Sequence, residues 1–168
     1  VGSFEAHSFE ELFEGTKALP WENFIGEFDE FPVKGHSVNS DLFSISDCQS
    51  IIKKAIVERL KTKYNVQWFE ETGVKFQIDF SIMKNKVHLM IDTTGMGLHK
   101  RGYRRNAMEA PIRETLAATI ADLGRVRRDS LVEDPFCGSG TLLIEAAQKA
   151  MNIAPGLKRR FAAERYSF

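Results

Sequence analysis

The sequence has few cysteines and no long apolar run, and each shortage excludes a class of protein. Cys48 and Cys137 are the only cysteines among 168 residues, which is too few for a disulfide framework or a multi-cysteine zinc site. No apolar stretch approaches the length of a membrane span. The first residues, Val1–His7, lack the basic and apolar regions of a signal peptide. We therefore expect a protein of the reducing cytoplasm, with no membrane and no metal among its partners.

Charge is balanced overall but uneven along the chain. The 23 basic and 23 acidic side chains give a net charge of zero, and 43% of the residues are apolar, which is a composition typical of globular proteins. Residues 1–50 hold ten acids and two bases, whereas residues 99–168 hold eight acids and thirteen bases. A polyanion would therefore meet the second half of the chain, although an uneven solvated surface is the simpler interpretation.

Periodicity predicts helices and a β-hairpin in the first half of the chain. Ser8 and Ser46 each begin a capping box, the pattern in which a hydroxyl and a later acid or amide satisfy free amides at a helix start. Alternation of apolar and polar residues indicates strands with one buried face. The predicted elements are helices over 8–19 and 46–64, an edge strand over 31–38, and a hairpin of strands 74–82 and 87–91 around a turn at 84–86.

Glycine and basic residues replace this periodicity after residue 92, and the pattern of an α/β domain then begins. The predicted elements are a helix from Pro111 to Leu123 with an apolar stripe of Ile112, Leu116, Ile120 and Leu123, a short strand at Leu131–Val132, and a helix over 142–152. A glycine-rich segment, residues 134–141, lies between the strand and the last helix. This order of strand, glycine loop and helix presents backbone amides to a ligand at a helix N-terminus.

The residues around the glycines disfavour phosphate as that ligand. Thr141 follows Gly140 directly, without the lysine of a phosphate-binding Walker loop. Leu143 occupies the position where the dinucleotide fingerprint has its third glycine. Asp134, at the end of the strand, can accept hydrogen bonds from ligand hydroxyls or an ammonium group.

The segment Asp134–Thr141, Asp-Pro-Phe-Cys-Gly-Ser-Gly-Thr, resembles the first motif of S-adenosylmethionine-dependent class I methyltransferases that act on amino groups of bases. Further segments resemble successive signatures of one family, the THUMP-containing RNA methyltransferases related to bacterial large-subunit ribosomal RNA guanine-N2 methyltransferases. They are Asp92–Gly95, Leu98–Arg104, Ala110–Ala118 and Ala154–Leu157. The resemblance implies that S-adenosylmethionine contacts Asp134, Pro135, Phe136, Cys137, Gly138, Ser139, Gly140 and Thr141.

The same resemblance implies an α/β fold, in which an α+β THUMP module precedes the first strands and helices of a Rossmann-like class I methyltransferase domain. We expect a remnant of a ferredoxin-like domain in residues 1–30, the THUMP RNA-binding domain in 31–103 and the methyltransferase part in 104–168. Only 28 residues follow Gly140, so the ribose-binding acid and the target-side Asn/Asp-Pro-Pro-Tyr-type motif of the family are not found. We expect a fragment without catalytic residues of its own, inactive alone.

Three functions are compatible with these residues. The resemblance favours methylation of 23S ribosomal RNA at guanine N2, with RNA as the partner. Adenine-N6 methylation of RNA or DNA is the first alternative, and a stand-alone RNA-binding module without catalysis is the second. Cys137 has no histidine nearby in the sequence to act as its base, so we do not expect it to act as a nucleophile.

A basic cluster before the second domain has two interpretations. Its residues are Lys100, Arg101, Tyr103, Arg104 and Arg105. The cluster either binds RNA, with arginines on phosphates and Tyr103 stacked on a base, or forms a hinge whose arginines pair with acids of the neighbouring domain.

Overall fold

The computed structural model describes residues 1–104 and 111–166, and the chain forms two compact units. The first unit contains Val1–Gly95 together with the segment from Ala162 onward, and the second contains Met96–Phe161. Among the described residues, no helix has both the length and the apolar character needed to cross a membrane.

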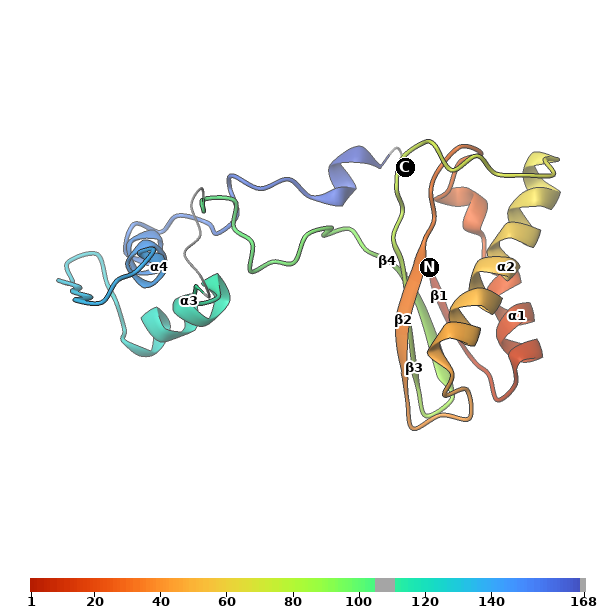
Figure 1. The fold of residues 1–168 in the computed structure, drawn as a ribbon, viewed down its shortest axis with the longest axis horizontal. Coiled ribbons are helices and arrows are strands. Elements are labelled where there is room, and N and C mark those ends of the chain that lie inside the picture. Colours follow the sequence, from red (N-terminus) through yellow and green to blue (C-terminus); the bar gives the residue numbers. More distant parts are fainter. Residues whose placement is uncertain (105–110, 167–168) are drawn as a thin grey trace. The chain divides into compact units, whose positions relative to one another are not determined.

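A four-stranded sheet forms the first unit, and two helices cover one of its faces (Figure 1). The strands are β1 (Gly2–Glu5), β2 (Val33–Val38), β3 (Ile78–Met83) and β4 (Lys86–Ile91), and the helices are α1 (Phe9–Lys17) and α2 (Ile45–Tyr64). The strand order is β1-β4-β3-β2. Strand β2 pairs in parallel with β3, while the other two pairs are antiparallel. The prediction that β2 is an edge strand is confirmed.

The two helices of this unit begin in different ways. Helix α1 begins at the predicted cap, where the Ser8 hydroxyl accepts a hydrogen bond from the Glu11 amide at 3.2 Å. The Glu11 carboxylate accepts from the amide of His7 at 2.7 Å, one residue before the usual position. The predicted capping box at Ser46 is wrong, because α2 already begins at Ile45 and its N-cap is Ser44, whose side chain makes no capping bond.

The predicted hairpin is present, with a shorter first strand. Strand β3 begins at Ile78, which pairs with Val33, the first residue of β2. The residues before these two positions form only an isolated bridge, between Glu30 and Lys75. Lys84 and Asn85 form the turn with positive φ angles of 50° and 64°. A turn of this kind matches the twist of the two strands.

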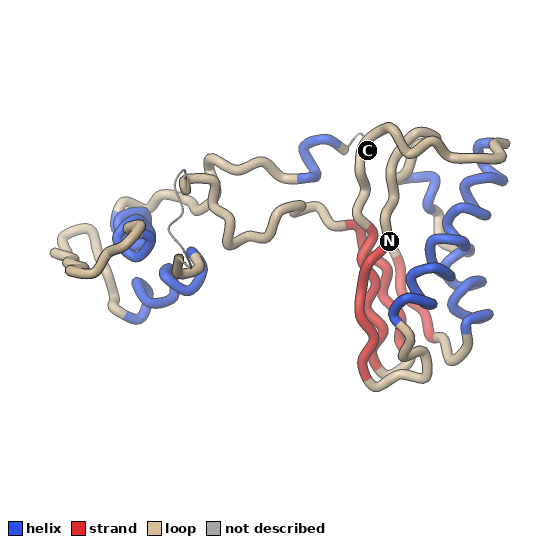
Figure 2. Tube along the Cα trace, viewed as in Figure 1, coloured by secondary structure: helices blue, strands red, loops and turns tan. Residues whose placement is uncertain are grey.

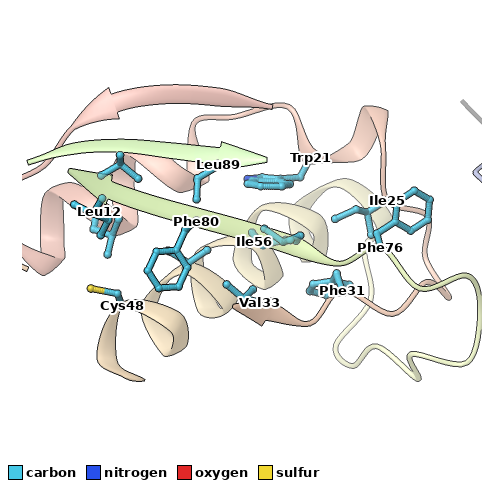
Figure 3. Close-up of a cluster of buried hydrophobic side chains, with 14 of the residues drawn as sticks. Leu12, Trp21, Ile25, Phe31, Val33, Cys48, Ile56, Phe76, Phe80 and Leu89 are labelled. Carbon is cyan, nitrogen blue, oxygen red and sulfur yellow. The ribbon is translucent and has the colours of Figure 1, made fainter. Parts of the chain in front are cut away.

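Large apolar side chains fill the space between the sheet and the helices (Figure 3). Fully buried members include Leu12, Trp21, Phe31, Ile56, Phe76 and Phe80. The Trp21 indole donates a hydrogen bond to the Thr16 carbonyl at 2.7 Å, which satisfies its one polar atom. Burial raises the pKa of the Cys48 thiol, so this cysteine is a packing residue rather than a reactive one.

The C-terminal segment returns to the first unit after Phe161. A short 3-10 helix, η2, spans Ala162–Arg165, and the Ala163 amide donates to the Thr93 carbonyl at 3.0 Å. The Tyr166 hydroxyl donates to the Asp92 carbonyl at 2.6 Å, and its ring stacks on Phe76 with the centroids 4.4 Å apart.

The compact units differ from the predicted division at residues 30 and 103. Strand β1 and helix α1, from the range that we expected to be a ferredoxin-like remnant, belong to the same unit as the rest of the sheet. Residues 162–166 also belong to that unit, because their hydrogen bonds and the Tyr166 ring contact are made with it.

The described part of the second unit contains helices and loops but no strand, as Figure 2 shows. Helices α3 (Glu114–Leu123) and α4 (Thr141–Ala150) pack against each other. The predicted strand at Leu131–Val132 is not formed, because no described residue of this unit offers a strand to pair with; Leu131 is exposed. For the same reason the predicted apolar stripe has no sheet to cover, and α3 instead buries Glu114, Ala117 and Ala121.

Candidate functional site

The glycine-rich segment forms an open loop at the start of α4. Gly140 is the N-cap with a φ of 72°, and Gly138 has a φ of 55°, so both adopt the left-handed conformation that favours glycine. A Cβ atom at Gly140 would meet nothing within 4 Å, and one at Gly138 would meet only the Phe136 carbonyl at 4.0 Å. No side chain of the described residues caps α4, so the first amides of the helix remain available to a ligand.

The side chains of this loop divide into an exposed group and an anchored group. Pro135, Phe136 and Cys137 are exposed, and the Phe136 ring is almost fully accessible. Asp134 Oδ1 accepts a hydrogen bond from the Phe136 amide at 3.1 Å. Thr141, the first residue of α4, is buried, and its Oγ1 lies 3.1 Å from Ser139 Oγ. The loop therefore presents an apolar ring and bare backbone while its far end is anchored.

Residues 101–104 lie against the starts of α3 and α4. Arg104 Nη2 donates to the Ile112 carbonyl at 3.0 Å and to Thr141 Oγ1 at 2.8 Å. The same nitrogen lies 3.6 Å from Glu114 Oε1, and the Glu114 side chain is only 6% exposed. One guanidinium group thus contacts the first residue of both helices.

Glu145, one turn along α4 from Thr141, is a second buried acid with partners from this segment. The Tyr103 hydroxyl donates to Glu145 Oε1 at 2.8 Å. Arg101 Nε lies 3.4 Å from the same oxygen, as an ion pair without hydrogen-bond geometry. Burial, and then the hydrogen bond to Glu145, raises the pKa of the Tyr103 hydroxyl far above its usual range. Tyr103 is therefore a neutral donor at physiological pH.

These contacts bear on the two interpretations of the basic cluster. Arg101 and Arg104 pair with acids, as the hinge interpretation expects, but the acids belong to the same unit as the arginines. Lys100 is exposed, and Arg105 lies outside the described residues. Binding of RNA by this cluster stays a prediction.

Arg159 is a structural residue that the sequence did not reveal. Its guanidinium is buried and donates to the carbonyls of Gly97 at 3.1 Å and Met96. Gly102 lies directly beside this segment with a φ of 84°, and a Cβ there would meet the Lys158 carbonyl at 2.8 Å. In the sequence, Arg159 is the middle residue of three consecutive basic residues, 158–160, and nothing in this pattern indicates that it is buried.

A cavity of about 420 Å³ lies beside the start of the second unit. Its lining residues are Met96, His99, Lys100, Gly102, Arg104, Pro111, Arg113 and Glu114. Arg104 and Glu114 both line this cavity. Arg104 therefore contacts the cavity as well as Thr141, the residue at the end of the glycine loop.

Known families match both parts of the chain. Residues 6–92 match the THUMP domain, and residues 101–166 match the RMKL-like methyltransferase domain. The "Putative RNA methyltransferase YpsC" of Bacillus subtilis is 51% identical over 166 residues, which are 98% of this chain and 43% of that protein. The "Ribosomal RNA large subunit methyltransferase K/L" of Vibrio cholerae is 36% identical over 162 residues, which are 95% of this chain and 23% of that protein.

Solved structures agree with these matches. A "predicted N6-adenine-specific DNA methylase" from Listeria monocytogenes superposes with a TM-score of 0.92 at 51% identity, over 99% of this chain and 44% of that one. SMU.472, solved in complex with SAH, superposes with a TM-score of 0.90 at 46% identity, over 100% of this chain and 45% of that one. The chain spans less than half the length of each of these relatives. The resemblance found in the motifs is confirmed: the chain belongs to the THUMP-containing methyltransferase family, and its THUMP domain continues into an RMKL-like methyltransferase domain.

Proposed function

We propose that this chain supplies the RNA-binding module and the cofactor loop of an S-adenosylmethionine-dependent RNA methyltransferase. The observation that carries the proposal is the open loop at Asp134–Thr141, with two left-handed glycines at the start of α4. The match to a methyltransferase domain and the SAH complex of SMU.472 support it.

The residues of the loop fit this cofactor. A Cβ at Gly140 would enter space that is open in the structure, so a ligand can approach the backbone there. Within the described residues, Asp134 Oδ2 has no hydrogen-bond donor, because only Oδ1 is used by the Phe136 amide. That oxygen can accept from a hydroxyl or ammonium group of the cofactor. When bound, S-adenosylmethionine supplies the transferable methyl group, while this chain binds and orients it.

The exposed apolar side chains of the second unit support a larger methyltransferase domain. Leu116, Leu123 and Leu131 are 53%, 79% and 88% exposed, although large apolar side chains usually gain free energy by burial. In the α/β architecture such helix faces cover a sheet. We infer that methyl transfer requires a longer polypeptide that supplies this sheet and the target-side residues.

The target we propose is guanine N2 of 23S ribosomal RNA. The name of the ribosomal RNA methyltransferase K/L relative supports a ribosomal target. Adenine N6 is the second candidate, since the Listeria neighbour carries that description. Digestion of methylated RNA to nucleosides, followed by mass spectrometry, separates N2-methylguanosine from N6-methyladenosine.

Calorimetry tests the cofactor directly. We expect the polypeptide extended to a complete methyltransferase domain to bind S-adenosylhomocysteine, and Gly138→Asp to abolish that binding while RNA affinity is retained. Aspartate tolerates the left-handed φ of 55° at this position, so its carboxylate acts by occupying the space of the ligand. Tight uptake of ATP or NAD, with indifference to S-adenosylhomocysteine, would overturn the proposal.

Transfer of labelled methyl groups tests the activity. The extended polypeptide should label ribosomal RNA from a strain that lacks the enzyme, whereas the 168-residue chain should not. Labelling by the short chain would contradict the need for further residues.

A further inference from the structure

We propose that Arg104 is a positioning residue for the cofactor loop rather than a ligand of RNA phosphates. The inference deepens the proposed function, since it rests on the loop at Gly138–Gly140 as the cofactor site. It starts from three contacts of one nitrogen, Nη2, with the Ile112 carbonyl, the Thr141 hydroxyl and the Glu114 carboxylate.

These contacts join the starts of α3 and α4, two helices that also pack against each other. Within residues 1–104 and 111–166, neither α3 nor α4 has a side-chain capping bond. Glu114 is the first residue of α3 and Thr141 is the first residue of α4, and both are buried. The planar, always charged guanidinium of Arg104 holds its acceptors in a fixed geometry. Arg104 therefore fixes the start of α4 relative to the start of α3.

The restraint continues from Thr141 into the loop itself. Thr141 Oγ1 lies 3.1 Å from Ser139 Oγ, and Ser139 is the residue between Gly138 and Gly140. Glycines have many accessible backbone conformations, so a loop built on two of them loses considerable entropy when it orders around a ligand. A loop that is already held through Arg104, Thr141 and Ser139 has less entropy to lose, and its ligand affinity is higher.

The surroundings of Arg104 disfavour a phosphate as its partner. The side chain is 20% exposed, and its positive charge already faces Glu114. A phosphate that displaced this contact would leave the nearly buried Glu114 carboxylate without its cation, which is strongly unfavourable. Lys100, by contrast, is exposed.

Two readouts test this role. The first is hydrogen exchange of the amides at residues 138–144 in the 168-residue chain, without cofactor. The second is the S-adenosylhomocysteine affinity of the extended polypeptide by calorimetry. The variants are Arg104→Met and Thr141→Val, which each break the Arg104–Thr141 bond, and Thr141→Ser, which retains the hydroxyl. Arg128→Met removes an exposed arginine of the same unit and is the matched control.

We expect Arg104→Met and Thr141→Val each to accelerate exchange in the loop and to weaken the affinity roughly tenfold, the effect of one hydrogen bond to a charged group. The double variant should bind no more weakly than the weaker single variant, because both changes break the same bond. Thr141→Ser should restore binding, and Arg128→Met should bind like the unchanged protein. Thr141→Val keeps the charge and volume of the site, so it remains informative if Arg104→Met does not fold.

Two outcomes separate this inference from the proposed function. If Arg104→Met leaves exchange and S-adenosylhomocysteine affinity unchanged but weakens RNA binding and lowers its salt slope by about one, the residue is a phosphate ligand and the inference is wrong. If the variants accelerate loop exchange but the unchanged protein binds no S-adenosylhomocysteine, the positioning role stands and the proposed cofactor is wrong.

Discussion

At the residue scale, a partly buried ion pair links the short 3-10 helix η1 (Trp21–Asn23) to α2. Arg59 donates from Nε and Nη2 to the two oxygens of Glu22, at 3.0 and 2.5 Å. The Glu22 side chain is 15% exposed, and its neighbour Trp21 is a fully buried core residue. The hydrogen bond from Arg59 lowers the pKa of the Glu22 carboxyl. The pair therefore favours the folded state whenever Glu22 is ionised.

The lowered pKa predicts how Glu22→Gln changes stability with pH. The folded-state pKa lies below the value of the unfolded chain, so the contribution of Glu22 is fully present above the unfolded value and is lost as pH falls through the folded-state pKa. We expect Glu22→Gln to lower the urea midpoint at pH 7 and to have a progressively smaller effect as the pH falls into the acid range. Glu14→Gln, at an exposed position of α1, is the control. An effect of Glu22→Gln that does not depend on pH would contradict this account.

At the element scale, local pattern predicted the first unit better than the second. Alternating residues in β3 and β4 gave the hairpin, because one face of these strands packs on the core. Strand β1 was not predicted, since Gly2–Glu5 has only four residues and no apolar alternation. Its strand conformation depends on pairing with β4, which is a tertiary contact that no local pattern contains.

In the candidate site too, the sequence predicted the local motif but not the charged residues that contact each other. The motif at Asp134–Thr141 located the glycine loop, because glycine spacing is a local property. The buried acids Glu114 and Glu145 were not predicted, since a helical glutamate is exposed in most proteins. Each buried acid pairs with an arginine from residues 101–104, and sequence alone does not show which residues meet.

Tyr166 provides a prediction for the C-terminal element. Its ring stacks on Phe76, and its hydroxyl donates to Asp92. We expect Tyr166→Ala to reduce the free energy of unfolding of the first unit by about 2 kcal/mol, through lost burial and ring contact. Tyr166→Phe, which keeps the ring, should cost about 1 kcal/mol. Urea denaturation of both variants beside Arg165→Ala, an exposed neighbour, measures these differences; equal losses for all three variants would count against the role of the stack.

At the scale of the whole molecule, the chain leaves and re-enters the first unit at adjacent points. The second unit begins after Gly95 and ends before Ala162. A Cβ built on Gly95 would lie 3.3 Å from the Ala162 Cβ. The first unit also has its own core of apolar side chains, from Ala6 to Leu89.

This arrangement predicts that residues 96–161 can be removed without loss of the remaining fold. A variant in which a short Gly-Ser linker joins Gly95 to Ala162 should unfold cooperatively in urea, with the Tyr166 contact retained. The linker has only a few ångströms to span, and loop closure over so short a distance costs little. Circular dichroism and the effect of Tyr166→Ala in the shortened variant measure the outcome. A shortened chain without a cooperative transition would show that the core is insufficient alone.

The adjacency of Gly95 and Ala162 also has a consequence for the architecture of such proteins. When the chain leaves and re-enters a domain at adjacent residues, another sequence can be inserted there without rearranging the sheet of that domain. Inserted segments of different lengths can therefore be exchanged between Gly95 and Ala162 while the sheet and helices of the first unit stay the same. In this molecule, the sequence of the second unit can therefore change without a change in the fold of the first.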